Sequence, residues 1–193
     1  MKNEYEGVIS IQYELVKLYI PAVISRNLNP VAMQFSTSRP GAGAVLLTGI
    51  TVGILDGAAA LLNAWFRSAI PPARVFQYIA SAMFGRDAYS GGGGTIAAGV
   101  FLHFLVAIIW SAIFFVAFPR IPVLRRNKWL VGCAYGIAVW LLMNFVVLPL
   151  TQVPPLNFTW QGVVTGLLIH MFVVGVTIVF MVRRWYRADM ALD

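Results

Sequence analysis

The chain has 193 residues, of which 60% are hydrophobic and 11% charged, and its formal net charge is +7. Soluble domains carry about 25% charged residues, and a domain of this length has too little interior for so much apolar sequence, so the composition excludes a soluble globular protein. Because the basic residues flank apolar segments, the surplus positive charge indicates lipid headgroups and membrane topology rather than nucleic acid.

Residues 1–44 precede the first long apolar stretch. Val8, Ile11, Leu15 and Leu18 recur there at helical spacing, which is compatible with a helix lying on the membrane surface. A short packing helix and a disordered tail are the alternatives. Charged residues interrupt the apolar pattern and no small-residue cleavage site follows, so we expect no cleavable signal peptide.

Four stretches are long and apolar enough to cross a hydrocarbon core of about 30 Å. They cover residues 45–66, 95–118, 129–149 and 160–182. The period-two pattern of a β-barrel is absent, so helices are the spanning structure expected. The predicted fold is an all-α polytopic membrane protein with one four-transmembrane-helix domain, residues 45–182, followed by a basic tail, residues 183–193.

Lysine and arginine counts predict the orientation of these spans. Segments 1–44, 119–128 and 183–193 together hold 11 of them, whereas the loop over residues 67–94 holds 3. The positive-inside rule therefore places both termini in the cytoplasm. Tryptophans at the span ends fit an interfacial aromatic belt: Trp65, Trp129, Trp160 and Trp185.

The loop over residues 67–94 is the only sizeable segment on the opposite side. Pro71-Pro72 can start a helix and Gly85 can end one. Val75, Ile79 and Met83 align on one stripe of that helix. We therefore expect a short helix that rests on the outer surface and caps the bundle.

Glycines at helical spacing predict close packing between the spans. Gly49, Gly53 and Gly57 would let another helix backbone approach the first span. Backbone that lines a substrate path is the alternative interpretation. Four further glycines are candidates for the same packing role: Gly99, Gly132, Gly136 and Gly166.

One polar group on each span falls in a common layer near the middle of the membrane. Asp56, on the first span, is the most informative because a charged residue at the bilayer centre costs roughly 2.5–3.5 kcal/mol on insertion scales. His103, Asn144 and His170 follow on the other three spans, and Asn63 lies farther out. These residues are the predicted intramembrane polar site, with interhelical hydrogen bonds as the structural alternative.

Two short motifs recur in alternate spans. Residues 99–103 and 166–170 both read Gly-x-x-x-His, and residues 49–54 and 132–137 both read Gly-x-x-x-Gly-Ile. A tandem repeat of two helical hairpins would leave this pattern. Chance is the alternative, since glycine is common in transmembrane helices.

Three chemistries could use the polar layer. Asp56 and the histidines could pass protons or small solutes. Two facing imidazoles could ligate a haem in a four-helix bundle. A divalent metal could take His103, His170 and Asp56. Hydrogen bonds worth about 0.6 kcal/mol each, which only fix the packing, are the competing explanation.

No serine, histidine and acid arrangement and no zinc-protease motif is present, so the chain is not expected to be an enzyme. The single cysteine, Cys133, excludes an intramolecular disulfide and a multi-cysteine metal site. The leading functional hypothesis is proton or small-solute permeation. Its rivals are an accessory or structural subunit of a larger membrane complex and a haem- or metal-binding redox protein.

Taken together, residues 45–182 resemble the YagU-like family of bacterial inner-membrane proteins. The resemblance rests on His103, the Phe118-Pro119 end of the second span, the segment from Asn144 to Leu150, the Pro154-Pro155 turn, and His170 before Arg183-Arg184. It implies a small four-helix protein of the bacterial inner membrane and brings no established substrate. The partners expected are the lipid bilayer and either further copies of the chain or a membrane-complex partner.

Overall fold

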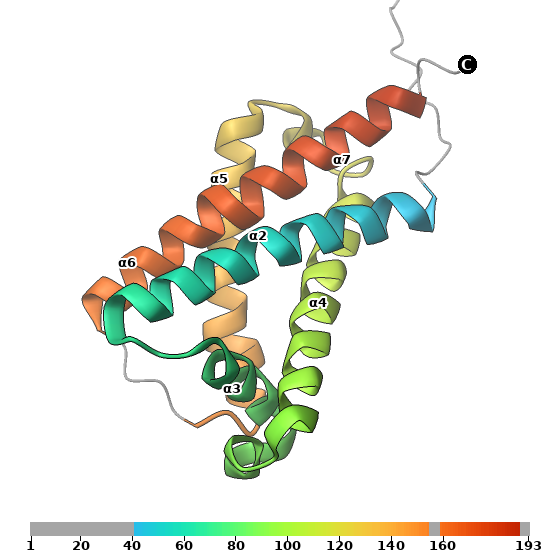
Figure 1. Cartoon of the computed structure of the whole chain (residues 1–193). Coiled ribbons are helices and arrows are strands. Elements are labelled where there is room, and N and C mark those ends of the chain that lie inside the picture. Colours follow the sequence, from blue (N-terminus) through green and yellow to red (C-terminus); the bar gives the residue numbers. More distant parts are fainter. Residues whose placement is uncertain (1–40, 155–158, 190–193) are drawn as a thin grey trace, which may run out of the picture. The chain divides into compact units, whose positions relative to one another are not determined.

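The computed structural model describes residues 41–154 and 159–189 (Figure 1). All regular elements in these residues are helical, as predicted. Among the described residues, four helices are long and apolar enough to cross a membrane. They overlap the four predicted spans, and the last one continues into the predicted basic tail: Ala42–Ser68, Gly92–Ala117, Lys128–Leu150 and Trp160–Arg187. The surface helix expected within the first 40 residues lies outside the described residues.

The elements follow one another in a simple order. They are α2 (Ala42–Ser68), α3 (Pro72–Phe84), α4 (Gly92–Ala117), α5 (Lys128–Leu142), α6 (Trp160–Leu168) and α7 (Val176–Asp189). A π-helical segment, Met143–Val147, prolongs α5, and a second one, Ile169–Gly175, joins α6 to α7. The third and fourth spans are therefore each interrupted by a wider turn, whereas the first two are regular α-helices.

The helix starts follow from local side-chain chemistry. The Asn127 side chain accepts hydrogen bonds from the backbone N–H groups of Trp129 and Leu130, which caps the N-terminus of α5. Thr159 caps α6 in the same way, through the N–H of Gly162. Pro149 explains the end of the third span, because it has no N–H and clashes with a helical carbonyl four residues earlier.

Glycines bring α2 and α4 into close contact. A Cβ atom built on Gly49 would lie 2.5 Å from Ile108, and one on Gly53 would lie 2.6 Å from the ring of Phe104. Real Cβ atoms almost never come so close, so only glycine fits. The predicted glycine face of the first span therefore packs on the second span of the same chain.

The third and fourth spans approach each other even more closely. Cβ atoms built on Gly132 and Gly136 would lie 2.7 Å from the Cα atom of Val176 and 2.6 Å from that of Met171. On the facing helix, a Cβ atom on Gly175 would overlap the backbone of both glycines. Backbone packs here on backbone, as small residues allow in membrane helices.

Buried side chains collect at one end of the bundle, where α4 ends, α5 begins and α7 passes. The largest of them with less than 2% exposure are aliphatic or aromatic: Phe114, Ile178, Val52, Val179 and Val182. This end also carries Arg120, Arg125, Arg126 and Lys128, with Arg183 to Arg187 on α7, so we call it the basic end. The opposite end is called the α3 end.

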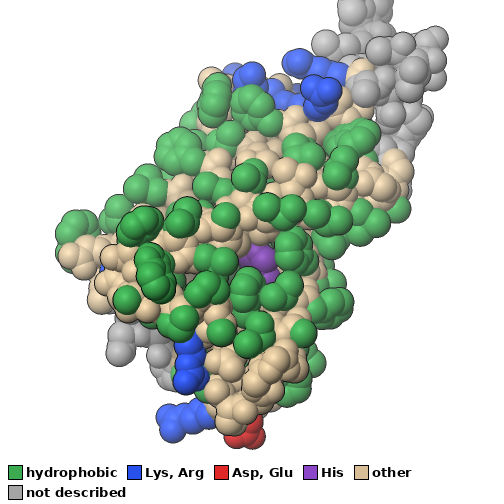
Figure 2. Space-filling view, viewed as in Figure 1, with side chains coloured by type: hydrophobic (Ala, Val, Ile, Leu, Met, Phe, Trp, Pro, Cys, Tyr) green, Lys and Arg blue, Asp and Glu red, His purple; other side chains and the backbone are tan. Residues whose placement is uncertain are grey.

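The α3 end is packed differently. No described side chain in residues 54–68, 141–154 or 159–173 is buried. Hydrophobic side chains cover much of the face seen in Figure 2, with basic groups toward its two ends and histidine atoms visible between them. The four spans therefore close around a core at the basic end and keep partial exposure at the other.

The helix expected in the loop over residues 67–94 is α3, which starts after Pro71 and ends at Gly85, where φ is 55°. Its last carbonyls accept hydrogen bonds from Gln152, through Nε2 to Met83 O at 2.9 Å and through the backbone N–H to Ala82 O at 3.2 Å. The loop after the third span thus anchors the end of α3.

The buried face of α3 is not the predicted apolar stripe. Met83 is 56% exposed, and Val75 and Ile79 are only half-buried. Three small or polar residues are buried instead: Gln77, Ala80 and Ser81. The reason is close backbone packing, because a Cβ atom on Gly99 of α4 would overlap the carbonyl of Phe76. Small side chains permit this approach, and Met83 stays exposed.

Tyr78 on α3 allows a test of this packing. Its hydroxyl is buried and has no hydrogen-bond partner among the described residues. Since an unsatisfied buried polar group costs about 1–3 kcal/mol, the Tyr78→Phe variant should be at least as stable as the wild type. The matched variant Tyr186→Phe should lose about 1 kcal/mol, because that hydroxyl donates to Phe115 O at 2.9 Å. Thermal unfolding in detergent at neutral pH measures both, and a destabilised Tyr78→Phe would contradict the assignment.

The same tyrosine predicts a pH dependence. Burial, and secondarily the charge of Tyr89, raises the pKa of Tyr78 to about 12 from 10.0. The fold therefore favours the neutral phenol, and this contribution to stability is present below pH 10 and lost as the pH rises through 12. Between these values the wild type should lose more stability than Tyr78→Phe does. Parallel pH profiles for the two proteins would contradict this.

Candidate functional site

His103 of α4 is held against α2. Its Nε2–H donates a hydrogen bond to the backbone carbonyl of Gly53, at 2.8 Å. A Cβ atom on Gly57 would lie 3.1 Å from the same nitrogen, so glycine leaves the space that the imidazole occupies. The ring therefore lies against the turn of α2 that contains Asp56. Because Nε2 carries the proton in this bond, Nδ1 is left as an acceptor.

Asp56 itself is half-buried and has no hydrogen bond or ion pair within the residues that the structure describes. Asn63, two turns farther along α2, is also half-buried and has no described partner. An unpaired carboxyl group in apolar surroundings is costly. Within the polar layer, Asp56 is thus the side chain for which the described residues supply no hydrogen-bond or ion-pair partner.

The third and fourth spans form the second hairpin. Its two polar residues, Asn144 and His170, lie near a contact between α5 and α6. A Cβ atom on Gly166 would lie 2.6 Å from the indole nitrogen of Trp140, so α6 and α5 touch there. The Nδ1–H of His170 donates to the carbonyl of Gly166, at 2.9 Å. The amide of Asn144 donates to the carbonyl of Trp140, at 2.8 Å. Both side chains bond to their own helix one turn earlier.

Both π-helical segments occur at this level. Asn144 lies in Met143–Val147 and His170 lies in Ile169–Gly175. Pro149 accounts for the first segment, but the second has no proline, and Val176 N–H reaches back five residues to Met171 O. Wider turns of this kind are frequent at functional sites. The segment around His170 is therefore the unusual backbone feature of the layer.

The layer as a whole is assembled only in part. His103 lies against the turn of α2 that contains Asp56. Asn144 and His170 belong to the two spans that touch at Trp140 and Gly166. The two hairpins adjoin where α2 meets the segment 169–175. All five predicted site residues are half-buried, and all lie where the bundle has no buried side chain on α2 or on the third and fourth spans.

The candidate metal ligands do not form one group in the described part of the chain. Within residues 41–154 and 159–189, no three His, Cys, Asp or Glu side chains form a group that could hold a metal ion. Asp56, His103 and His170 are therefore not brought together as ligands. The reason is that the His103 ring is fixed against Gly53, whereas the His170 ring is turned back onto its own helix.

Two contacts of the site were not predicted from the sequence. Trp140 supplies both the indole that meets Gly166 and the carbonyl that Asn144 uses. Gly175 packs its backbone on that of Gly132 and Gly136. Gly175 could have been found as a further small residue on the fourth span, since it faces the Gly132 and Gly136 pair.

The chain matches no protein-family model, no curated protein and no solved structure. The resemblance to the YagU-like family thus stays a prediction.

Proposed function

We propose that the protein handles protons or a small polar solute within the bacterial inner membrane, using Asp56, His103 and His170. The observation that carries the proposal is the state of Asp56, a half-buried carboxyl group with no partner in the described residues. Such a group can bind and release a proton or a cation, whereas a carboxyl group that only fixes packing would have a donor in a neighbouring helix.

The two histidines support this assignment. Each is oriented by a hydrogen bond from one ring nitrogen to a backbone carbonyl, of Gly53 or of Gly166. The other ring nitrogen then keeps a lone pair that can accept a hydrogen bond or a proton. Backbone carbonyls thus fix the tautomers, and the polar layer retains groups that can exchange protons.

The core at the basic end limits what kind of path this can be. Phe114, Ile178 and Val52 are fully buried there, and close packing leaves no room for a solute. A path through the chain must therefore open this core. We infer a gated mechanism, in which the layer exchanges with the α3 side while the basic end is closed. The basic end faces the cytoplasm in this proposal.

The register of the helix contacts supports a tandem repeat of two hairpins. Gly99 and His103 of α4 can be aligned with Gly166 and His170 of the fourth span. The α4 residues that pack on Gly49 and Gly53 then align with the residues of the fourth span that pack on Gly132 and Gly136. The matched contacts are Gly53 with Phe104 and Gly136 with Met171, and Gly49 with Ile108 and Gly132 with Gly175. Repeats of this kind place transport sites at their interface, where α2 meets the segment 169–175.

A membrane-complex subunit is the second candidate, because a donor from another chain could satisfy Asp56. The surface for it cannot be Gly49 and Gly53, which α4 covers. It would be the half of α2 beyond residue 54, where no side chain is buried. Homo-oligomers are the commonest assemblies, so a further copy of the chain is the partner to test first. No described contact favours haem.

Replacing both histidines tests the proposal. The double variant His103→Gln/His170→Gln keeps a donor for each backbone carbonyl but cannot take up a proton. We expect its proton flux in proteoliposomes to fall at least about tenfold, as loss of a positioned acid–base group does. An unchanged melting temperature shows that the fold is intact. Wild-type flux in a folded double variant would remove the histidines from the mechanism.

A further inference from the structure

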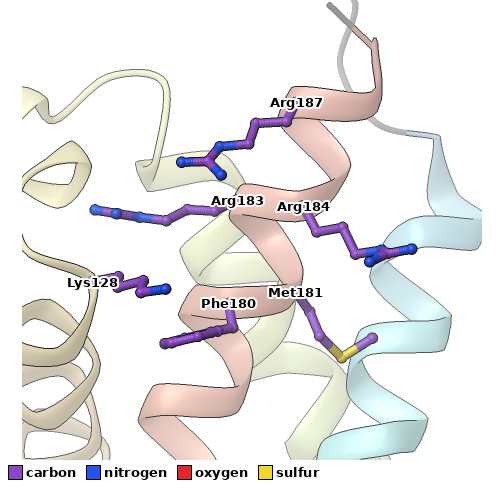
Figure 3. Close-up of a pocket in the computed structure, with 6 residues that line it drawn as sticks. All are labelled: Lys128, Phe180, Met181, Arg183, Arg184 and Arg187. Carbon is purple, nitrogen blue, oxygen red and sulfur yellow. The ribbon is translucent and has the colours of Figure 1, made fainter. Parts of the chain in front are cut away.

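A pocket of about 450 Å³ lies at the basic end, where α7 passes the start of α5 (Figure 3). Figure 3 shows Arg183 and Arg187 reaching toward α5, above Lys128 and Phe180, while Arg184 reaches toward α2. The full lining is Lys128, Phe180, Met181, Arg183, Arg184 and Arg187. The pocket is separate from the polar layer of the proposed site.

All the charged side chains that line this pocket are positive. Four of its six side chains are cationic and none is acidic. Lys128 is also the first residue of α5, where the positive end of the helix dipole makes a cation unfavourable and an anion favourable. Four positive charges around one hollow repel each other. An anion bound in the pocket would attract each of these cations and offset their mutual repulsion.

Two of the cations are held in place by the fold. The Nη2 group of Arg183 donates to Leu124 O at 2.8 Å and also to Arg126 O. Its Nε–H is buried and has no acceptor among the described residues. The Lys128 ammonium lies 4.3 Å from the centre of the Phe180 ring, a cation–π contact. An incoming anion therefore meets two cationic side chains that the fold already holds in place.

The remaining lining is apolar, and this indicates the source of the anion. Phe180 and Met181 belong to the apolar part of the fourth span, and the Phe180 ring meets that of Trp129 at 4.9 Å. Tryptophans at span ends mark the level of the lipid headgroups. Basic pockets between transmembrane helices at this level suit phospholipid headgroups. A soluble anion would not need the apolar wall.

We propose that this pocket binds the phosphate of an anionic phospholipid, with Lys128, Arg183 and Arg187 around the headgroup and Phe180 and Met181 along the start of an acyl chain. The site does not depend on the proposed proton or solute handling. It gives the chain a specific lipid contact at the basic end, beyond the general attraction of basic loops for anionic membranes.

Native mass spectrometry of the full chain in neutral detergent, titrated with phosphatidylglycerol, tests the proposal. Each basic residue near an anionic lipid is worth roughly fivefold in affinity. The double variant Lys128→Gln/Arg187→Gln should therefore bind this lipid about thirtyfold more weakly than the wild type. Arg183 is left unchanged because it also holds the turn before α5. Phosphatidylcholine should bind weakly to every variant.

The matched control removes two positive charges from the same end without touching the pocket. Arg120 and Arg126 are exposed and do not line it, so Arg120→Gln/Arg126→Gln should keep wild-type affinity. Equal losses in the two double variants would overturn the pocket in favour of general charge attraction. Inorganic phosphate should not displace the lipid at millimolar concentration. Displacement would overturn the lipid assignment and identify a site for soluble phosphate compounds.

Discussion

Proteoliposomes of the Asp56→Asn variant are expected to show proton or solute flux no higher than protein-free liposomes. Asparagine has nearly the same size as aspartate and keeps hydrogen-bonding capacity, but it cannot bind and release a proton. Because Asp56 has no partner within the described residues, the substitution breaks no observed contact and should leave the fold intact. The readout is decay of an imposed pH gradient, followed with an entrapped pH-sensitive dye.

Two further variants serve as a control and as a rescue for this experiment. Asp87 is an exposed acid in the turn after α3, so Asp87→Asn removes the same charge outside the spans and should retain wild-type flux. Asp56→Glu restores the carboxyl group and should recover part of the flux. If Asp56→Asn instead keeps full flux, the carboxyl group is not in the path. A smaller particle on size-exclusion chromatography, without a change in flux, would favour the assembly role of α2.

Alanine at Gly136 or Gly175 should destabilise the protein strongly for a change of one methyl group. At either position the added Cβ atom would overlap the backbone of the facing helix, at His170 for the first and at Gly132 for the second. Backbone cannot rotate away as a flexible side chain can, so the third and fourth spans must separate. Overpacking of this kind costs about 1–3 kcal/mol or more, which thermal unfolding in detergent would detect.

Gly94 provides the control for this experiment. It lies in α4 and has nothing within 4 Å of its Cβ position, so Gly94→Ala should be neutral or stabilise by about 0.5–1 kcal/mol through helix propensity. The contrast separates close packing from the general effect of alanine in a helix. If Gly136→Ala and Gly94→Ala had the same melting temperature, the backbone contact between the spans would be wrong.

The sequence predicted the spans well because hydrophobicity over about 20 residues is a strong, local signal. Pro71, Pro72 and Gly85 also gave the bounds of α3, since proline and glycine act on the backbone directly. The buried face of α3 was missed because its packing is set by Gly99 on another helix. An apolar stripe indicates which side chains avoid water, and at a membrane surface lipid satisfies that need as well as the bundle does.

The site was predictable as a set of residues but not as an arrangement. Polar side chains in apolar spans are visible in any sequence, so Asp56, His103 and His170 could be named. Their partners could not, because His103 bonds across to α2 while His170 bonds within its own helix. The π-helical turn around His170 contains no proline from which it could have been predicted. Such details depend on the register between helices, which local patterns do not determine.

The proposed function requires Asp56 to gain and lose a proton, and infrared difference spectroscopy of the reconstituted protein after a pH jump tests this most directly. We expect a carboxyl band that changes with pH, persists in Asp87→Asn and disappears in Asp56→Asn. A difference spectrum that is the same in the wild type and in Asp56→Asn would contradict it, because Asp56 would then keep one protonation state throughout.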